Sequence, residues 1–189
     1  MPHPLSLPPG IRAEGHAIVS VDRMIADADG LMPETLRNDV DWRAFQAALD
    51  IAAVVVVGRL GHQRHPNPGR RRLVFTRSVT GFRPDPKDPK AVLFNPDAAS
   101  LAEVLAFLGI REGTLAITGG TGVFDAFLPV FDRFELAEAQ QAFLPGGRPC
   151  FTGGHPRTAL VAAGLLPSSF ELIDPQAKVS LIGWTRAGT

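Results

Sequence analysis

Residues 51–84 contain seven arginines and no aspartate or glutamate. The arginines are Arg59, Arg64, Arg70, Arg71, Arg72, Arg77 and Arg83. Guanidinium groups pair with the oxygens of phosphates and carboxylates, often through two hydrogen bonds at once, so this stretch can bind an anion. A basic loop that faces only solvent is the common alternative for a run of like charges.

A glycine-rich segment, Thr118-Gly119-Gly120-Thr121-Gly122, follows a short apolar run and precedes a helical pattern through Phe127. Free amides at the start of a helix can bind a phosphate, whereas a glycine pair can also serve only a tight turn. No Gly-Lys-Ser/Thr follows, and Asp125 stands where a dinucleotide fingerprint needs its third glycine. The segment is therefore a candidate phosphate site, but it is neither a Walker A loop nor a dinucleotide-binding fingerprint.

Asp41 and Phe45 are four residues apart in a segment with helical periodicity that Asn38 or Asp39 can cap. This spacing places a carboxylate and an aromatic ring on one face of a helix, where they can hold a flat heterocycle. An aspartate in the first turn of a helix also serves commonly as a capping or dipole-stabilising residue. Both interpretations stay open on spacing alone.

Other reactive residues give weaker signals. His62 and His65 are three residues apart, but no carboxylate lies nearby in the sequence, so we predict surface histidines and no metal site. The only cysteine, Cys150, lies in an apolar segment and is predicted to be a buried, inert thiol in a strand at 150–152. The sequence also lacks the pattern of a nucleophile elbow.

The composition predicts one globular domain that does not span a membrane. The chain has 189 residues, of which 45% are apolar and 20% charged, with nineteen basic and nineteen acidic side chains. No apolar run approaches the roughly 20 residues of a membrane span, and no signal peptide is evident, so we expect a cytoplasmic protein. Because basic residues are not in excess, nucleic acid is not an expected partner.

The order of elements predicts an α/β fold. Four prolines among the first ten residues indicate an extended arm over 1–14, and a single domain follows at 15–189. Strands alternate with helices until two strands follow each other at the end, which favours a mostly parallel sheet closed by an antiparallel C-terminal hairpin. The strands are expected at 16–21, 52–57, 72–76, 91–94, 115–118, 134–136, 170–173 and 179–184, and the helices at 38–49, 100–108, 121–127 and 157–163. Residues 83–90 read as a proline-rich loop.

Taken in chain order, these motifs resemble the dihydrofolate reductase superfamily, which includes the reductase domain of riboflavin biosynthesis. The resemblance covers about residues 15–152. Residues 18–26 look like the opening strand and turn of the family, and Leu31-Met32-Pro33 is similar to its mobile substrate loop. The resemblance implies a three-layer α/β fold with a mostly parallel central sheet and flanking helices.

On the substrate side, Asp41 to Phe45 resembles the Asp-x-x-x-Phe helix of the family. The resemblance implies that Asp41 is the catalytic acid and binds the amino edge of a pterin ring while Phe45 packs on that ring. Asp39 is the rival acid if the gap is placed differently. Gly69-Arg70 matches the turn whose arginine holds the glutamate carboxylate of dihydrofolate. The substrate-binding residues implied are Ala17, Ile18, Met32, Phe45 and Arg70.

On the cofactor side, three motifs are similar to the segments that bind NADPH. Gly58-Arg59 resembles the Gly-Arg motif near the adenosine phosphate, and Thr76-Arg77 looks like the pair that selects the 2′-phosphate. Gly119-Gly120 resembles the loop that receives the pyrophosphate and has a cis peptide between its glycines. The cofactor-binding residues implied are Gly58, Arg59, Thr76, Arg77, Gly119, Gly120, Thr121, Gly122 and Val123.

The chain departs from the family pattern at Glu34, Gly61 and Ala137, and residues 146–151 look more like the riboflavin branch. The resemblance implies an NADPH-dependent reductase that transfers a hydride to C6 of a dihydropteridine, either dihydrofolate or a relative such as dihydromethanopterin, in one-carbon metabolism. The alternatives are a riboflavin-pathway reductase of a ribosylaminopyrimidine and a non-catalytic dinucleotide-binding protein. The expected partner is a pterin-type small molecule, and homodimer formation stays open.

Overall fold

The computed structural model describes residues 5–65, 67 and 69–188. Its main feature is a nine-stranded sheet with the strand order β10-β11-β8-β1-β7-β3-β4-β6-β5. The strands are β1 (Ile11–Ser20), β3 (Val54–Gly58), β4 (Arg72–Phe75), β5 (Phe82–Asp85), β6 (Asp88–Phe94), β7 (Gly113–Ile117), β8 (Arg133–Ala139), β10 (Leu165–Asp174) and β11 (Val179–Arg186). A separate two-stranded sheet joins β2 (Met24–Ala26) to β9 (Arg148–Pro149).

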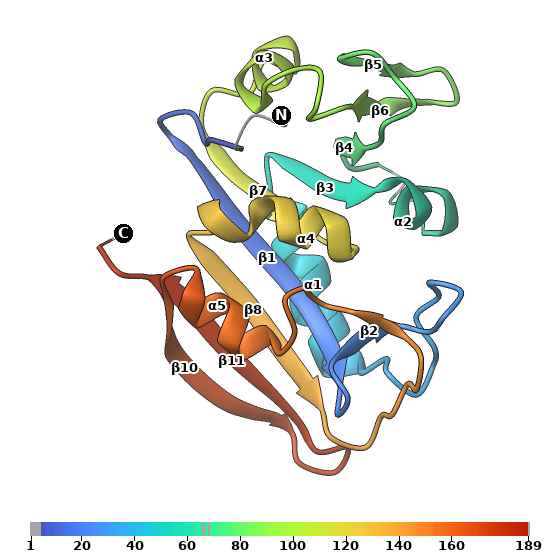
Figure 1. The fold of residues 1–189 in the computed structure, drawn as a ribbon, viewed down its shortest axis with the longest axis vertical. Coiled ribbons are helices and arrows are strands. Elements are labelled where there is room, and N and C mark those ends of the chain that lie inside the picture. Colours follow the sequence, from blue (N-terminus) through green and yellow to red (C-terminus); the bar gives the residue numbers. More distant parts are fainter. Residues whose placement is uncertain (1–4, 66, 68, 189) are drawn as a thin grey trace.

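Helices cover both faces of the main sheet, so the fold has three layers. In Figure 1, α1 lies behind the sheet, and α4 and α5 lie in front of it. The helices are α1 (Asp39–Ile51), α2 (Arg59–Arg64), α3 (Leu101–Phe107), α4 (Thr121–Phe127) and α5 (Pro156–Ala162), with a 3-10 turn at Leu128–Val130. Among the described residues, no helix is long and apolar enough to cross a membrane.

The pairing of the strands confirms the predicted sheet. The six central strands, from β8 to β6, are parallel to one another, and β10 and β11 form the antiparallel hairpin at one edge. Carboxyl ends of parallel strands meet at one edge of a sheet, where ligands of open α/β sheets bind. The ends of β1, β3, β4 and β7 therefore lie together.

The core explains why β3 is a continuous valine run. Val54 and Val56 belong to the large cluster that includes side chains of α3, α4 and α5, whereas Val55 packs with Leu49 of α1. A strand buried on both faces needs apolar side chains at consecutive positions. The strand predicted at 52–57 is confirmed as β3, which is covered on both faces.

Two helix starts follow their predicted caps. The Asn38 side chain accepts hydrogen bonds from the amides of Val40 at 3.0 Å and Asp41 at 3.1 Å. Ser100 and Glu103 form the capping box of α3. These local bonds fix where each helix begins.

The structure differs from the sequence-based prediction at several elements. β1 begins at Ile11, so residues 11–14, which we expected in the arm, belong to the central sheet, and Leu5 and Leu7 pack against the core. Met1 to Pro4 lie outside the described residues. The predicted loop at 83–90 is a hairpin, because β5 is an edge strand and an edge tolerates proline. The predicted strand at 150–152 is replaced by β9 and an isolated bridge between Phe151 and Gly154.

Candidate functional site

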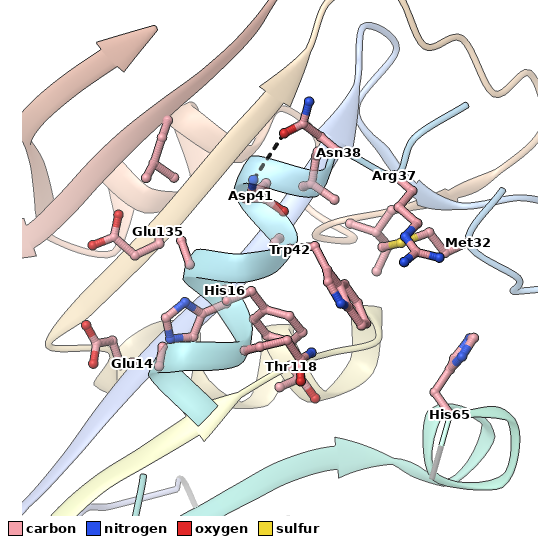
Figure 2. Close-up of a pocket in the computed structure, with 18 of the residues that line it drawn as sticks. Glu14, His16, Met32, Arg37, Asn38, Asp41, Trp42, His65, Thr118 and Glu135 are labelled. Atoms are coloured by element: carbon pink, nitrogen blue, oxygen red, sulfur yellow. Dashed lines mark hydrogen bonds between the residues drawn. The ribbon is translucent and has the colours of Figure 1, made fainter. Parts of the chain in front are cut away.

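A cavity of about 1550 Å³ lies beside α1 and at the carboxyl ends of the central strands. It is lined by residues of β1, α1, β3, α2, β8 and β10 and by Thr118, which follows β7. Figure 2 shows Glu14, His16 and Glu135 on one side of α1 and Met32, Arg37 and His65 on the other. The cavity therefore extends along the helix that carries Asp41.

Asp41 is the candidate acid of this cavity. Its amide is held by Asn38, but its carboxyl group has no hydrogen-bond or ion-pair partner among the described residues (Figure 2). Burial raises the pKa of Asp41 from 3.8 to about 6, because the charged form loses hydration. Its rival Asp39 is exposed and does not line the cavity. The geometry thus favours Asp41 as the acid that meets a ligand.

The five residues predicted to bind substrate all line this cavity: Ala17, Ile18, Met32, Phe45 and Arg70. The ring of Phe45 lies 5.8 Å from the rings of both His16 and Trp42, measured between centroids. An aromatic wall of this kind suits a planar ligand. The structure thus places in one cavity the residues that the family resemblance assigns to substrate binding.

Arg70 lies at the rim with its guanidinium already engaged by the protein. Its Nε and Nη2 donate to one oxygen of Asp50 at 3.0 and 2.6 Å, and its Nη1 donates to the side-chain oxygens of Gln46 and Asn67 at 2.8 and 3.1 Å. A further bond joins Nη2 to the carbonyl oxygen of Gln46 at 3.4 Å. The expected partner, a substrate carboxylate, would have to displace Asp50.

The predicted cofactor residues gather at the ends of β3, β4 and β7. The amide of Gly58 donates to the carbonyl oxygen of Gly119 over 2.8 Å, and the peptide between Gly119 and Gly120 is cis, as the resemblance predicts. Gly120 caps α4, and no side chain completes that cap. The paired glycines and the Gly58-Arg59 turn thus form one continuous surface.

The loop offers an unfilled space for a ligand. A Cβ at Gly122 would have no atom within 4 Å, and one at Gly120 would reach only Ile25 at 4.0 Å. At Gly119, whose φ is +96°, a Cβ would lie 2.8 Å from the Phe124 ring, so this position requires glycine. The backbone can therefore approach a phosphate closely on one side while packing on Phe124 on the other.

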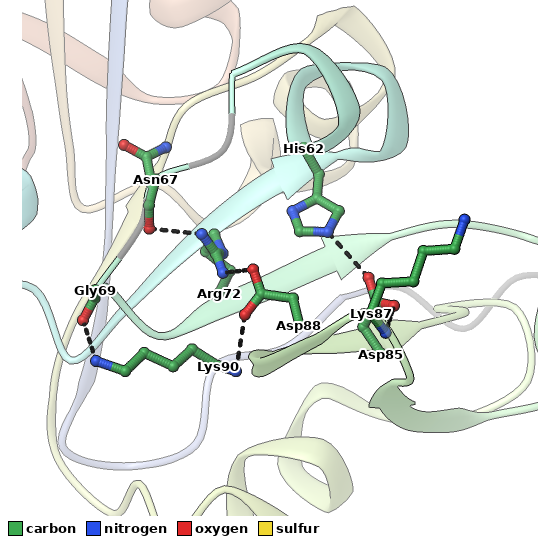
Figure 3. Close-up of polar contacts among 8 residues, drawn as sticks. All are labelled: His62, Asn67, Gly69, Arg72, Asp85, Lys87, Asp88 and Lys90. Atoms are coloured by element: carbon green, nitrogen blue, oxygen red, sulfur yellow. Dashed lines mark hydrogen bonds and ion pairs between the residues drawn. The ribbon is translucent and has the colours of Figure 1, made fainter.

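The arginine-rich stretch divides into engaged and available side chains. Arg72 is buried, pairs with Asp88 and also donates to the carbonyl oxygen of Asn67 at 2.5 Å (Figure 3). Arg59 is exposed and has no partner among the described residues, and Arg77 makes only a surface pair with Asp97 at 3.0 Å. Surface pairs of this kind contribute little and exchange readily. Arg59 and Arg77 can therefore bind an anion at the ends of β3 and β4, whereas Arg83, also exposed and without a partner among the described residues, lies on the edge strand β5.

Thr76 follows β4 directly, next to the Gly58-Arg59 turn, because Phe75 pairs with Gly58 in the sheet. It is buried, and its hydroxyl lies 2.9 Å from that of Ser78. This bond holds the turn that carries Arg77 at the edge of the sheet. Thr76, Arg77 and Arg59 thus occupy neighbouring positions.

Of the two histidines predicted to lie at the surface, His65 does and His62 does not. His62 is not a surface residue: its side chain is 12% exposed, and its Nε2 lies 3.0 Å from a carboxylate oxygen of Asp85, which joins α2 to the β5–β6 hairpin (Figure 3). His65 is exposed and lines the cavity. Cys150 is buried, as predicted, and burial raises the pKa of its thiol. The described residues contain no cluster of metal-ligating side chains.

Sequence reasoning missed the polar floor of the cavity. His16 and Glu14 on β1 lie beside Glu135 and Arg133 on β8, with His16 paired to Glu135 in the sheet register. Burial, with Arg133 nearby, lowers the pKa of His16 to about 4, so its imidazole is neutral at neutral pH. Alternation along β1 indicates that Glu14 and His16 share one face of the strand, but only the folded structure shows that this face lines a cavity.

Comparisons with known proteins rest on the fold. No protein-family model and no curated protein matches the chain. Dihydrofolate reductase from Enterococcus faecalis, complexed with NADP(H) and RAB-propyl, superposes with a TM-score of 0.65 at 18% identity, over 93% of this chain and 96% of that one. The chain has the dihydrofolate reductase-like fold. The predicted fold class is thereby confirmed.

Two further structures share the dihydrofolate reductase-like fold. The diaminohydroxyphosphoribosylaminopyrimidine deaminase/5-amino-6-(5-phosphoribosylamino)uracil reductase from Thermotoga maritima gives a TM-score of 0.63 at 15% identity over 93% of this chain. The present chain spans 56% of that protein's length. A Shewanella protein assigned to riboflavin biosynthesis gives 0.62 at 18% identity, over 93% and 98% of the two chains. Because the match covers 93% of this chain, the dihydrofolate reductase-like fold extends beyond residue 152.

Proposed function

We propose that the chain is an NADPH-dependent reductase of a dihydropteridine, with Asp41 as its catalytic acid. The observation that carries the proposal is the position of Asp41: an unpaired, half-buried carboxyl group beside Phe45, in a cavity at the same edge of the sheet as the paired glycines. Solved structures with this fold include a reductase bound to NADP(H), which supports the choice of coenzyme.

The residues at the sheet edge fit a phosphorylated dinucleotide. The loop Gly119 to Val123 offers an open backbone surface for the pyrophosphate, and Gly58 allows close approach beside it. Arg59, which has no partner among the described residues, and Arg77, which makes only the surface pair with Asp97, supply guanidinium groups for the adenosine phosphate, and Thr76 directly precedes Arg77. When bound there, NADPH supplies the hydride for reduction.

Asp41 orients the substrate ring and supplies electrostatic stabilisation. When ionised, the carboxylate accepts hydrogen bonds from the amino and ring N–H groups of a pterin lying against Phe45. A negative charge in a buried site also favours the protonated form of the ring that accepts the hydride. With a pKa of about 6, Asp41 holds or releases a proton within the range in which enzymes operate.

A second candidate is a riboflavin-pathway reductase of a ribosylaminopyrimidine. The engaged state of Arg70 favours it, because dihydrofolate binding by this family uses that arginine for the glutamate carboxylate, and here Asp50 occupies it. The third alternative, a dinucleotide-binding protein without catalysis, uses the same coenzyme surface. It requires no reacting substrate at Asp41.

Spectrophotometric oxidation of NADPH tests the three functions. We expect turnover with at least one dihydropterin from a panel of dihydrofolate, dihydrobiopterin and dihydromethanopterin, and none with the ribosylaminopyrimidine. Turnover of the pyrimidine alone would establish the second candidate. Coenzyme binding without turnover of any substrate would favour the non-catalytic alternative.

Replacement of Arg77 by alanine tests the coenzyme assignment. We expect Arg77→Ala to weaken NADPH binding about tenfold, the value of one charge-assisted hydrogen bond, and to leave NADH binding within about twofold. Fluorescence titration of each reduced coenzyme measures both constants. Arg83→Ala, an exposed arginine of the same basic stretch, is the matched control and should change neither. Equal weakening of the two coenzymes by Arg77→Ala would refute a role in reading the 2′-phosphate.

A further inference from the structure

Helix α1 brings two acids to the cavity: Asp41 near its N-terminus and Asp50 near its C-terminus. The two aspartates are nine positions apart on the same helix, which corresponds to about 13 Å along its axis. Both line the cavity, together with Gln46, which lies between them. A ligand whose ring lies at Asp41 and Phe45 and whose tail extends past Gln46 would meet Asp50 and Arg70.

Asp50 completes a closed set of bonds around Arg70. One of its oxygens accepts from both Nε and Nη2 of Arg70, and Gln46 and Asn67 accept from the remaining donors. Guanidinium has five N–H donors and no acceptor, so little donor capacity is left for a ligand. The positive charge of Arg70 is balanced by the carboxylate of Asp50.

The Asp50 carboxylate opposes an anionic tail at this place. Asp50 is 65% exposed, so its carboxylate faces the rim, whereas the Arg70 side chain is 21% exposed behind it. A tail that carries carboxylates would have to break the Asp50 bonds and then lie beside Asp50, a like charge. An uncharged tail meets no such penalty and can accept or donate hydrogen bonds at Gln46 and Asn67.

We propose that Asp50 is a specificity-determining residue that holds Arg70 closed and selects substrates whose tail is uncharged at this end of the cavity. The inference rests on the proposed function and narrows its substrate class to dihydropterins with a neutral side chain. Dihydrofolate, whose tail ends in a glutamate dicarboxylate, is then a poor substrate, because its carboxylates must displace Asp50 from Arg70 and lie beside a like charge.

Equilibrium binding of two pterins to the intact protein tests this role. We expect the wild type to bind dihydrobiopterin, which has a neutral side chain, more tightly than dihydrofolate. Asp50→Ala frees the Arg70 donors and should lower the Kd for dihydrofolate about tenfold while leaving that for dihydrobiopterin within about twofold. The double variant Asp50→Ala/Arg70→Ala should lose this gain. Asp39→Ala removes an exposed acid of α1 outside the cavity and serves as the matched control.

The outcomes separate this inference from the proposed function. An Asp50→Ala variant that binds both pterins with unchanged affinity, or gains equally for both, overturns the role of Asp50 and leaves the reductase proposal intact. A gain for dihydrofolate that persists without Arg70 also overturns it. Failure of the wild type to bind either pterin overturns the dihydropteridine function and the role of Asp50 together, and NADPH titration of the same samples then reports whether the coenzyme site stands. Because Asp50 is largely exposed, the variants should fold, which thermal melting confirms.

Discussion

Asp41→Asn should lower kcat at least about 100-fold while leaving the Kd for NADPH unchanged. The substitution keeps the shape of the side chain but removes the charge and the titratable proton, contributions typically worth two to four orders of magnitude in rate. Steady-state kinetics and coenzyme titration measure the two quantities separately. A non-catalytic binding protein would show no change in its ligand affinity.

Asp39→Asn is the matched control, because Asp39 is an exposed acid two residues earlier on the same helix. It should retain wild-type kcat. If instead Asp39→Asn abolishes turnover and Asp41→Asn does not, the assignment of the acid is reversed.

The difference in stability between the wild type and Asp41→Asn should depend on pH. The folded-state pKa of Asp41 lies above its ordinary value, so the ionised carboxylate destabilises the fold above pH 6, and this penalty disappears as the pH falls towards 4. We expect Asp41→Asn to be more stable than the wild type by about 2–3 kcal/mol at pH 8 and by almost nothing at pH 4. Denaturant unfolding at both pH values measures the difference. A difference independent of pH would show that Asp41 is not desolvated.

Asp88→Ala should cause the largest loss of stability, about 3 kcal/mol. Its carboxylate is the ionic partner of Arg72, whose side chain is 1% exposed at the start of β4 (Figure 3). Removal of one member of a buried pair leaves an uncompensated charge in the interior, and this is more costly than the loss of the pair as a whole. For a chain of this length, the expected fall in Tm is about 6–12 °C.

The double variant Arg72→Leu/Asp88→Ala tests the cause of that loss. Without the buried guanidinium, no charge is left unpaired, so the double variant should recover much of the stability lost in Asp88→Ala. Calorimetric melting of the wild type, both single variants and the double variant completes the cycle. Additive losses from the two substitutions would contradict the buried-charge explanation.

Local chemistry made several features predictable. The valines of β3 need no distant information to indicate a doubly covered strand, and Asn38 caps α1 through bonds that span only three residues. The Gly119-Gly120 pair, read through its family resemblance, correctly indicated a cis peptide at the end of β7. Each of these signals is confined to a few consecutive residues.

Partner choice over long sequence distances was not predictable. Nothing in the sequence near Arg70 indicates that Asp50, twenty residues earlier, binds it, because that pairing depends on how α1 lies over the sheet. The β5–β6 hairpin was missed for a related reason: its prolines indicate a loop unless the strand is known to lie at an edge. His16 reads as a core residue until the cavity beside it is seen.

The amide group of Asn38 does more than begin a helix. While its oxygen receives the amide of Asp41, its nitrogen donates over 2.8 Å to Asp174, which lies 136 positions later at the tip of the C-terminal hairpin. Two hydrogen bonds thus connect this tip to the backbone of Asp41. We therefore expect substitutions at residues 174–178 to shift the position of Asp41, although none of these residues lines the cavity.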